Sequence, residues 1–137
     1  MEIEVLKRIF DFLKEKGERR TPLKFKLLNN VPLTEEDLNI EGILDLSFSS
    51  IKSLPEGLKV GGTLSLEHST IQTLPKGLKV GDTLDLYDCK NITSLPEGLE
   101  VGENLYIKNT QLIKYTDKEL KEMIKPGFIK GKIHRIW

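Results

Sequence analysis

Residue Leu54 opens the segment LPEGLKVGGTLSLEHSTIQT, which recurs twice further along the chain. The second copy begins at Leu74 and reads LPKGLKVGDTLDLYDCKNITS. The third copy begins at Leu95 and reads LPEGLEVGENLYIKNTQLIK. The spacing is 20 residues between the first two copies and 21 between the last two. A fixed period of this length predicts a solenoid, in which each repeat packs only on its neighbours.

A degenerate copy precedes these three, because its apolar residues match those of the first full copy in order and spacing. The matching residues are Leu38, Ile40, Leu44, Leu46 and Ile51 against Leu58, Val60, Leu64, Leu66 and Ile71. Residues 34–37 replace the Leu-Pro-x-Gly element there. We therefore predict four repeats over residues 34–114.

Each repeat contains a short alternation of apolar and polar residues, such as Leu64 and Leu66 among Thr63, Ser65 and Glu67. This is the period of a strand with one buried face. The expected core residues are Leu44, Leu46, Leu64, Leu66, Leu84, Leu86, Leu105 and Ile107. The small polar residues that follow the strands are Ser49, Ser69, Cys89 and Thr110. We expect them to turn inward and satisfy backbone groups, and we expect the Leu-Pro-x-Gly elements to form extended or short helical returns.

This pattern resembles the leucine-rich repeat family, whose core reads L-x-x-L-x-L-x-x-N-x-L with 20–29 residues per repeat. The LP-x-x-L element and the short period are most similar to bacterial repeats, including those of secreted effectors. The V-G-G-x-L-x-L variant resembles repeats of bacterial and phage-encoded proteins. The resemblance covers about 80 of the 137 residues, and Ser, Ser, Cys and Thr replace the family's Asn. We expect an α/β fold: a short leucine-rich-repeat solenoid with a single parallel β-sheet and helical caps at both ends.

The two ends of the chain are expected to cap the solenoid. In residues 1–33, an apolar stripe over residues 3–13 predicts an amphipathic helix, and the alternation Leu23, Phe25, Leu27 predicts a strand beside the first repeat. In residues 115–137, Thr116 and Glu119 form a capping-box pattern that predicts a helix, followed by an extended tail. The domain organisation is therefore a cap over 1–33, repeats over 34–114 and a cap over 115–137.

Charge is balanced overall and uneven along the chain. There are 21 Lys plus Arg and 21 Asp plus Glu, which removes the general argument for nucleic acid or an anionic membrane as a partner. Residues 1–30 carry net +3, residues 31–110 net −7 and residues 111–137 net +4. This partition has three interpretations: solubility with mutual attraction, an acidic sheet face that meets a basic partner, or basic tails that bind nucleic acid. With no long apolar run and one cysteine, we expect a cytoplasmic protein of a bacterial or host cell.

The polar strand positions of a solenoid line its concave surface, where such folds usually bind. We expect the binding residues to be Glu67, Asp85, Tyr87, Tyr106 and Lys108. Exposed tyrosines are common interface anchors, although tyrosine also simply favours strand positions.

Three other groups suggest chemistry and have plainer interpretations. His68 and Asp88, with Asp85 and Cys89, suggest a metal or catalytic pair, but Cys89 belongs to the inward column and zinc needs three or four convergent ligands. The C-terminal residues His134, Arg135 and Trp137, with Lys130 and Lys132, suggest nucleic-acid or anion binding or, with their apolar neighbours, packing onto the cap. The glycines of VGG and VGD belong to the repeat and precede no phosphate-loop lysine. We expect no catalytic residue, no metal and no cofactor.

The resulting hypothesis is a non-enzymatic module that binds another protein through the concave sheet face, as an inhibitor or adaptor encoded by a bacterium or phage. The alternative is a structural component of a larger assembly, for example a virion. The partner, the source and the oligomeric state cannot be read from these residues.

Overall fold

A computed structural model describes residues 23–29 and 31–136, and contacts divide the chain into two units, residues 1–33 and 34–137. The helix predicted over residues 3–13 and Trp137 lie outside the described residues. In the first unit, helix α2 spans Leu23–Leu28, so the prediction of a strand at Leu23–Leu27 is wrong. Leucine and lysine are both good helix formers, and five alternating residues are too few to separate a strand from a helix.

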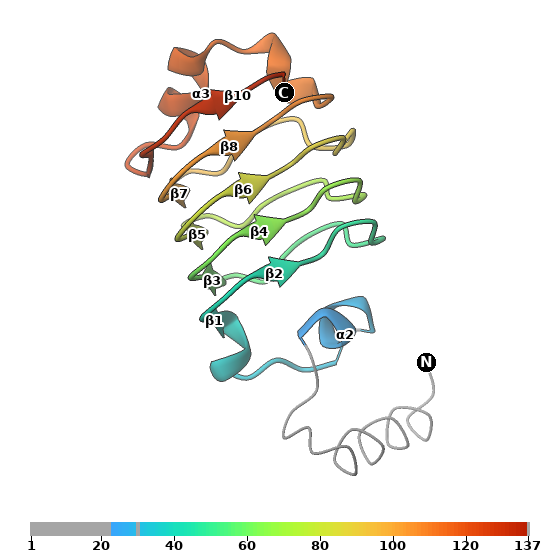
Figure 1. The fold of residues 1–137 in the computed structure, drawn as a ribbon. Coiled ribbons are helices and arrows are strands. Elements are labelled where there is room, and N and C mark those ends of the chain that lie inside the picture. Colours follow the sequence, from blue (N-terminus) through green and yellow to red (C-terminus); the bar gives the residue numbers. More distant parts are fainter. Residues whose placement is uncertain (1–22, 30, 137) are drawn as a thin grey trace. The chain divides into compact units, whose positions relative to one another are not determined.

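The second unit is a short parallel β-solenoid with two sheets (Figure 1). Sheet A joins β1 (Asn39–Ile40), β3 (Lys59–Val60), β5 (Lys79–Val80), β7 (Glu100–Val101) and β9 (Phe128–Ile129). Sheet B joins β2 (Leu44–Asp45), β4 (Leu64–Ser65), β6 (Leu84–Asp85), β8 (Leu105–Tyr106) and β10 (Ile133–His134). Every pairing is parallel. Pairs among β1–β8 are offset by one repeat, as in Leu64 opposite Leu84, whereas β9 and β10 pair with β7 and β8 at an offset of 28 residues.

The expectation of a single sheet is wrong, because each repeat makes two strands. The Leu-Lys-Val stretch, to which the sequence analysis assigned no strand, is itself an alternation with a buried side. Leu58 and Val60 are 1% and 2% exposed, while Lys59 points outward from sheet A. The Val-Gly pair that follows turns the chain from sheet A into sheet B.

The glycine of that Val-Gly pair is required by close stacking. A Cβ added to Gly61 would lie 2.6 Å from the carbonyl oxygen of Glu41 in the preceding repeat. At Gly81 the added atom would overlap the backbone of Gly61. Neighbouring repeats therefore meet backbone to backbone at this corner, which explains why the glycine recurs with the period of the solenoid.

The predicted core is confirmed. The eight expected core residues, seven leucines and one isoleucine, are all buried, none more than 7% exposed. The inward column of small polar residues is also confirmed: the Ser49 and Thr110 hydroxyls donate to the carbonyls of Leu46 and Ile107, each at 2.7 Å. Each of these bonds satisfies a backbone carbonyl oxygen at the bend that follows the strand.

The last strand of each sheet comes from the C-terminal segment, after two helices. The 3-10 helices η1 and η2 span Glu36–Leu38 and Gln111–Lys114, and helix α3 spans Asp117–Met123. The predicted capping box is present, with Glu119 N donating to Thr116 Oγ1 at 3.1 Å and Thr116 N donating to Glu119 Oε1 at 3.0 Å. The bonds to Thr116 hold the pKa of the Glu119 carboxyl below its usual value. Strands β9 and β10 then add to both sheets.

Within the described residues, no helix has the length and apolar character needed to cross a bilayer.

Candidate binding surface

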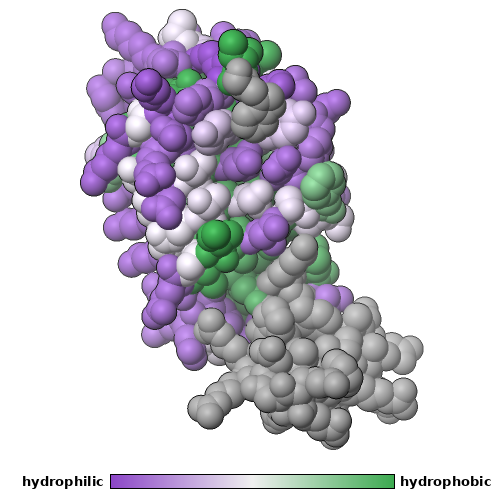
Figure 2. Space-filling model, in the orientation of Figure 1, coloured by the Kyte–Doolittle hydropathy of each residue, from purple (hydrophilic) through white to green (hydrophobic). Residues whose placement is uncertain are grey.

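The side chains that alternate with the buried leucines point outward from sheet B, and we call this surface the sheet B face. The five predicted binding residues all lie on it and are all partly exposed: Glu67, Asp85, Tyr87, Tyr106 and Lys108. Beyond the strands, backbone bonds keep the repeats in register, since His68 N donates to the Tyr87 carbonyl at 2.9 Å and Asp88 N donates to the Lys108 carbonyl at 3.0 Å. Glu67, Tyr87 and Lys108 are therefore neighbours in one column. In the view of Figure 2, hydrophilic and intermediate residues cover most of the coloured surface, and hydrophobic residues form smaller green areas among them.

Tyr87 is the centre of this column. Its ring contacts the His68 ring edge-on at a centroid distance of 4.9 Å, and the Lys108 ammonium lies 5.6 Å from its centroid. Below it, Asp85 Oδ1 accepts a hydrogen bond from Tyr87 N at 2.9 Å, which fixes the backbone as the strand ends. The tyrosine is thus held by neighbours on both sides while its ring remains partly exposed.

Tyr106 is held in a different way. Its ring stacks on that of His134 from β10, with centroids 4.5 Å apart and an interplanar angle of 12°. A stacked pair of this kind restricts the rotamers of both rings, so less side-chain entropy remains to be lost when a partner binds. The sequence placed Tyr106 on the face but did not identify His134 as its neighbour.

His68 and Asp88 form a pairwise contact between an imidazole and a carboxylate. His68 Nδ1 lies 2.8 Å from Asp88 Oδ2, and His68 Nε2 lies 3.6 Å from Glu67 Oε1. Lys90 Nζ is 3.7 Å from the other oxygen of Asp88. Neither carboxylate converges with further ligands, and no group of three or more His, Cys, Asp or Glu in the described part of the chain is placed to hold a metal.

Phe48 is a residue that the sequence did not single out. It is 74% exposed, and its ring stacks on His68 with centroids 4.6 Å apart. Its backbone lies in the left-handed region at φ +58°, as do those of its counterparts His68, Asp88 and Asn109. Histidine, aspartate and asparagine tolerate this conformation, whereas a bulky aromatic is an outlier there. The signal available in the sequence was a lone phenylalanine in a column of short polar residues.

Cys89 belongs to the interior. It is fully buried, its thiol donates to the Leu66 carbonyl, and Ser69 Oγ lies 3.8 Å from its sulfur. Burial raises the pKa of this thiol, with a smaller contribution of the same sign from Asp85 and Asp88 and an opposing one from its bonds to Ser69. A buried thiol with a raised pKa lacks the exposed, electropositive setting that a nucleophile needs.

The basic C-terminal residues are partly used to anchor the chain. Arg135 Nη2 lies 2.7 Å from Asp117 Oδ1, and Arg135 Nη1 donates to the Ile113 carbonyl at 3.1 Å. These bonds tie β10 to the start of α3 and favour packing over anion binding for Arg135.

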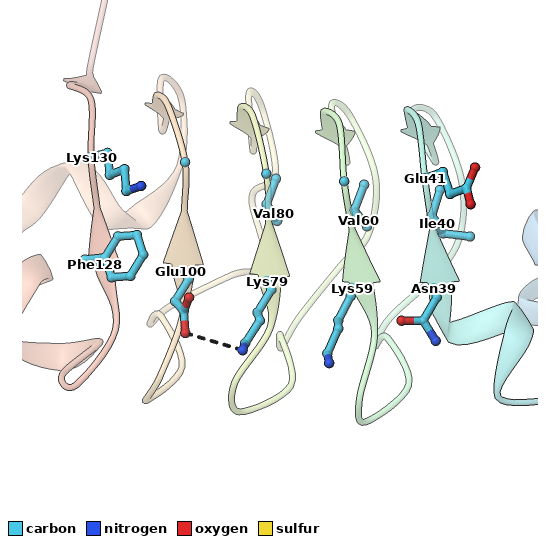
Figure 3. Close-up of a pocket in the computed structure, with 13 residues that line it drawn as sticks. Asn39, Ile40, Glu41, Lys59, Val60, Lys79, Val80, Glu100, Phe128 and Lys130 are labelled. Atoms are coloured by element: carbon cyan, nitrogen blue, oxygen red, sulfur yellow. Dashed lines mark ion pairs between the residues drawn. The ribbon is translucent and has the colours of Figure 1, made fainter.

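Sheet A bears a shallow groove that the sequence analysis did not predict (Figure 3). Its volume is about 490 Å³, and its floor includes Gly61, Gly81 and Gly102. The outward residues beside the glycines carry both signs of charge, with Lys79 Nζ 3.8 Å from Glu100 Oε2 and Lys130 Nζ 5.6 Å from the Phe128 ring centroid. Lys79 and Lys130 are thus each in contact with a neighbouring side chain of sheet A.

Comparisons of the chain with protein-family models, with curated proteins and with solved structures each found no match.

Proposed function

We propose that this protein is a non-enzymatic binding module that docks another protein on the sheet B face. Its coils are short leucine-rich repeats of the kind seen in bacterial and phage-encoded proteins, with the flanking segments as caps. The period of 20 or 21 residues and the buried Leu-x-Leu or Leu-x-Ile pair of each repeat at sheet B support this membership.

The observation that carries the proposal is the exposed ring and left-handed backbone of Phe48. A ring that is 74% exposed contributes little to the core, and its left-handed backbone costs stability. A bulky residue that is kept in such a conformation while most of its surface stays exposed favours a role in function. The Phe48 ring contacts the His68 ring, and the His68 ring contacts the Tyr87 ring. Three aromatic rings from successive repeats therefore form one row at the edge of the face.

Within this face, we assign the anchoring role to the tyrosines and the orienting role to the charges. Tyr87 and Tyr106 supply large, restrained rings of the type that dominates interface energetics. Glu67, Asp85 and Lys108 surround them and can select a partner of complementary charge. A catalytic role is not proposed, because these groups make ordinary pairwise contacts with no nucleophile or base aimed at a shared point.

The test is an affinity capture with the full chain as bait. The double variant Tyr87→Ala, Tyr106→Ala should lose at least about ten-fold in affinity for a captured partner, since truncating a buried interface aromatic commonly costs about 1–2 kcal/mol or more. Tyr115→Ala is the matched control, because Tyr115 follows η2 and lies outside the sheet B face. Equal affinity of the double variant and the control would contradict the assignment.

A further inference from the structure

Charge is segregated along the stacking direction of the sheet B face. On the outward strand positions, the carboxylates are Asp45, Glu67 and Asp85, from the repeats that contain β2, β4 and β6. The basic residues at outward positions are Lys108, which follows β8, and Lys132, which precedes β10. His134 lies in β10 itself, opposite Tyr106 of β8. One half of the face is therefore acidic and the other half basic.

Such a face is complementary to itself when it is turned end to end. A two-fold axis parallel to the strands and centred on β6 reverses the order of the strands and keeps each column facing itself. Glu67 of one molecule then faces Lys108 of the other, because both lie in the column that contains Tyr87. Asp45 faces His134 in the next column. Two-fold interfaces are built from one self-complementary patch, and this patch has that property.

The ends of the face add apolar contact in the same arrangement. Phe48 and Ile136 are 74% and 77% exposed and lie at opposite ends of sheet B. Ile136 follows β10 in the column of Lys108, and the residue facing it across the axis is Ser47, next to Phe48. This two-fold arrangement thus covers two apolar side chains that each molecule leaves in water.

We propose that a second copy of this chain docks on the sheet B face, related by a two-fold axis parallel to β6. This inference rests on the proposed function, since it names the occupant of the same face. Five strands at ~4.8 Å and about six residues of ~3.3 Å give roughly 20 Å by 20 Å. This area is smaller than the ~800 Å² per partner of a standard interface, so the dimer is weak, concentration-dependent and sensitive to salt.

The test is the solution mass of the full chain, measured by sedimentation between about 10 µM and 1 mM at low salt. Wild type should pass from monomer to dimer in this range. Glu67→Lys and Lys108→Glu should each weaken self-association about ten-fold or more, because each homodimer then faces two like-charge pairs. An equimolar mixture of the two variants should regain dimer, since both pairs are again of opposite sign.

Matched controls carry the same changes of charge away from the face. Glu56→Lys and Lys76→Glu are exposed substitutions in the Leu-Pro-x-Gly returns, and neither should change the dimer affinity. Asp85 lies near the axis and would face its own copy, so Asp85→Asn should tighten the dimer while its amide oxygen still accepts from Tyr87 N. A weaker dimer for Asp85→Asn would overturn the position of the axis.

A wild type that stays monomeric at 1 mM, or a mixture that fails to recover, would overturn the second copy as the occupant. If the tyrosine double variant then still loses a captured partner of another sequence, the proposed function survives with a different occupant. If the double variant binds every captured partner as tightly as wild type does, both proposals fail. Failure of the dimer alone and failure of the binding face are therefore distinguishable.

Discussion

At the scale of single residues, Phe48 separates backbone strain from ring contacts. Phe48→Asn and Phe48→Ala both remove the ring and its stacking on His68, but asparagine tolerates the left-handed backbone better than alanine. The asparagine variant should therefore have a free energy of unfolding about 1 kcal/mol higher than the alanine variant, measured by urea denaturation. Both should lose affinity on the sheet B face equally. Equal stability of the two variants would mean that the left-handed backbone is not retained there.

Cys89 predicts a dependence of stability on alkaline pH. Its thiol is buried and its pKa is raised mainly by that burial, so the folded chain binds this proton more tightly than the unfolded chain does. The resulting stability is complete below the ordinary thiol pKa of ~8.5 and is lost as pH rises through it towards the raised value. Relative to Cys89→Ser, which cannot titrate here, wild type should lose up to about 1.4 kcal/mol per pH unit in urea denaturation above pH ~8.5. Parallel stability profiles would contradict the burial of this thiol.

At the scale of elements, the glycine between sheets A and B is the most sensitive position in a repeat. Gly81→Ala would place a methyl group against the backbone of Gly61, which no side-chain rotation can relieve. We expect a loss of about 2 kcal/mol or more in the free energy of unfolding, in the range of severe overpacking. Gly42→Ala is the control, because an added Cβ there meets nothing within 4 Å and should change stability little. A similar loss in both variants would mean that the close approach to Gly61 is not the cause, since Gly→Ala by itself lowers the entropy of the unfolded chain and favours folding.

The elements also show what the sequence could and could not predict. The leucine alternation identified sheet B and its core, because burial on one side of a strand imposes a period of two. Sheet A was missed because its alternation covers only Leu58 to Val60 between two glycines and its polar member is a lysine, which indicates a loop as readily as a strand. β9 and β10 lack the Leu-Pro-x-Gly element, so the repeat pattern alone did not assign them to the sheets.

For the site, the sequence predicted the column of outward residues but not the turn beside it. The five proposed residues follow from counting alternate positions along the strands. The left-handed turn and the stacking of Phe48 on His68 depend on backbone angles that a pattern of residue types does not specify. Tyr106 and His134 meet only because the C-terminal segment returns to sheet B. The pattern of residue types therefore did not predict the contacts between side chains that are distant in the sequence.

At the scale of the whole molecule, a solenoid should tolerate the loss of a complete repeat, because each repeat contacts only its neighbours. Deleting residues 54–73 joins Ser53 to Leu74, removes one period of 20 residues and leaves every later strand facing its usual side. We expect the shortened chain to fold with lower stability and a smaller denaturant slope, since less surface is exposed on unfolding. Deleting residues 54–63 is the matched control: it removes half a period, so the chain loses β3 and its Val-Gly corner but keeps β4. Circular dichroism and urea denaturation should then show a cooperative transition for the first deletion and none for the second. The reverse order of stabilities would mean that the repeats do not act as independent stacking units.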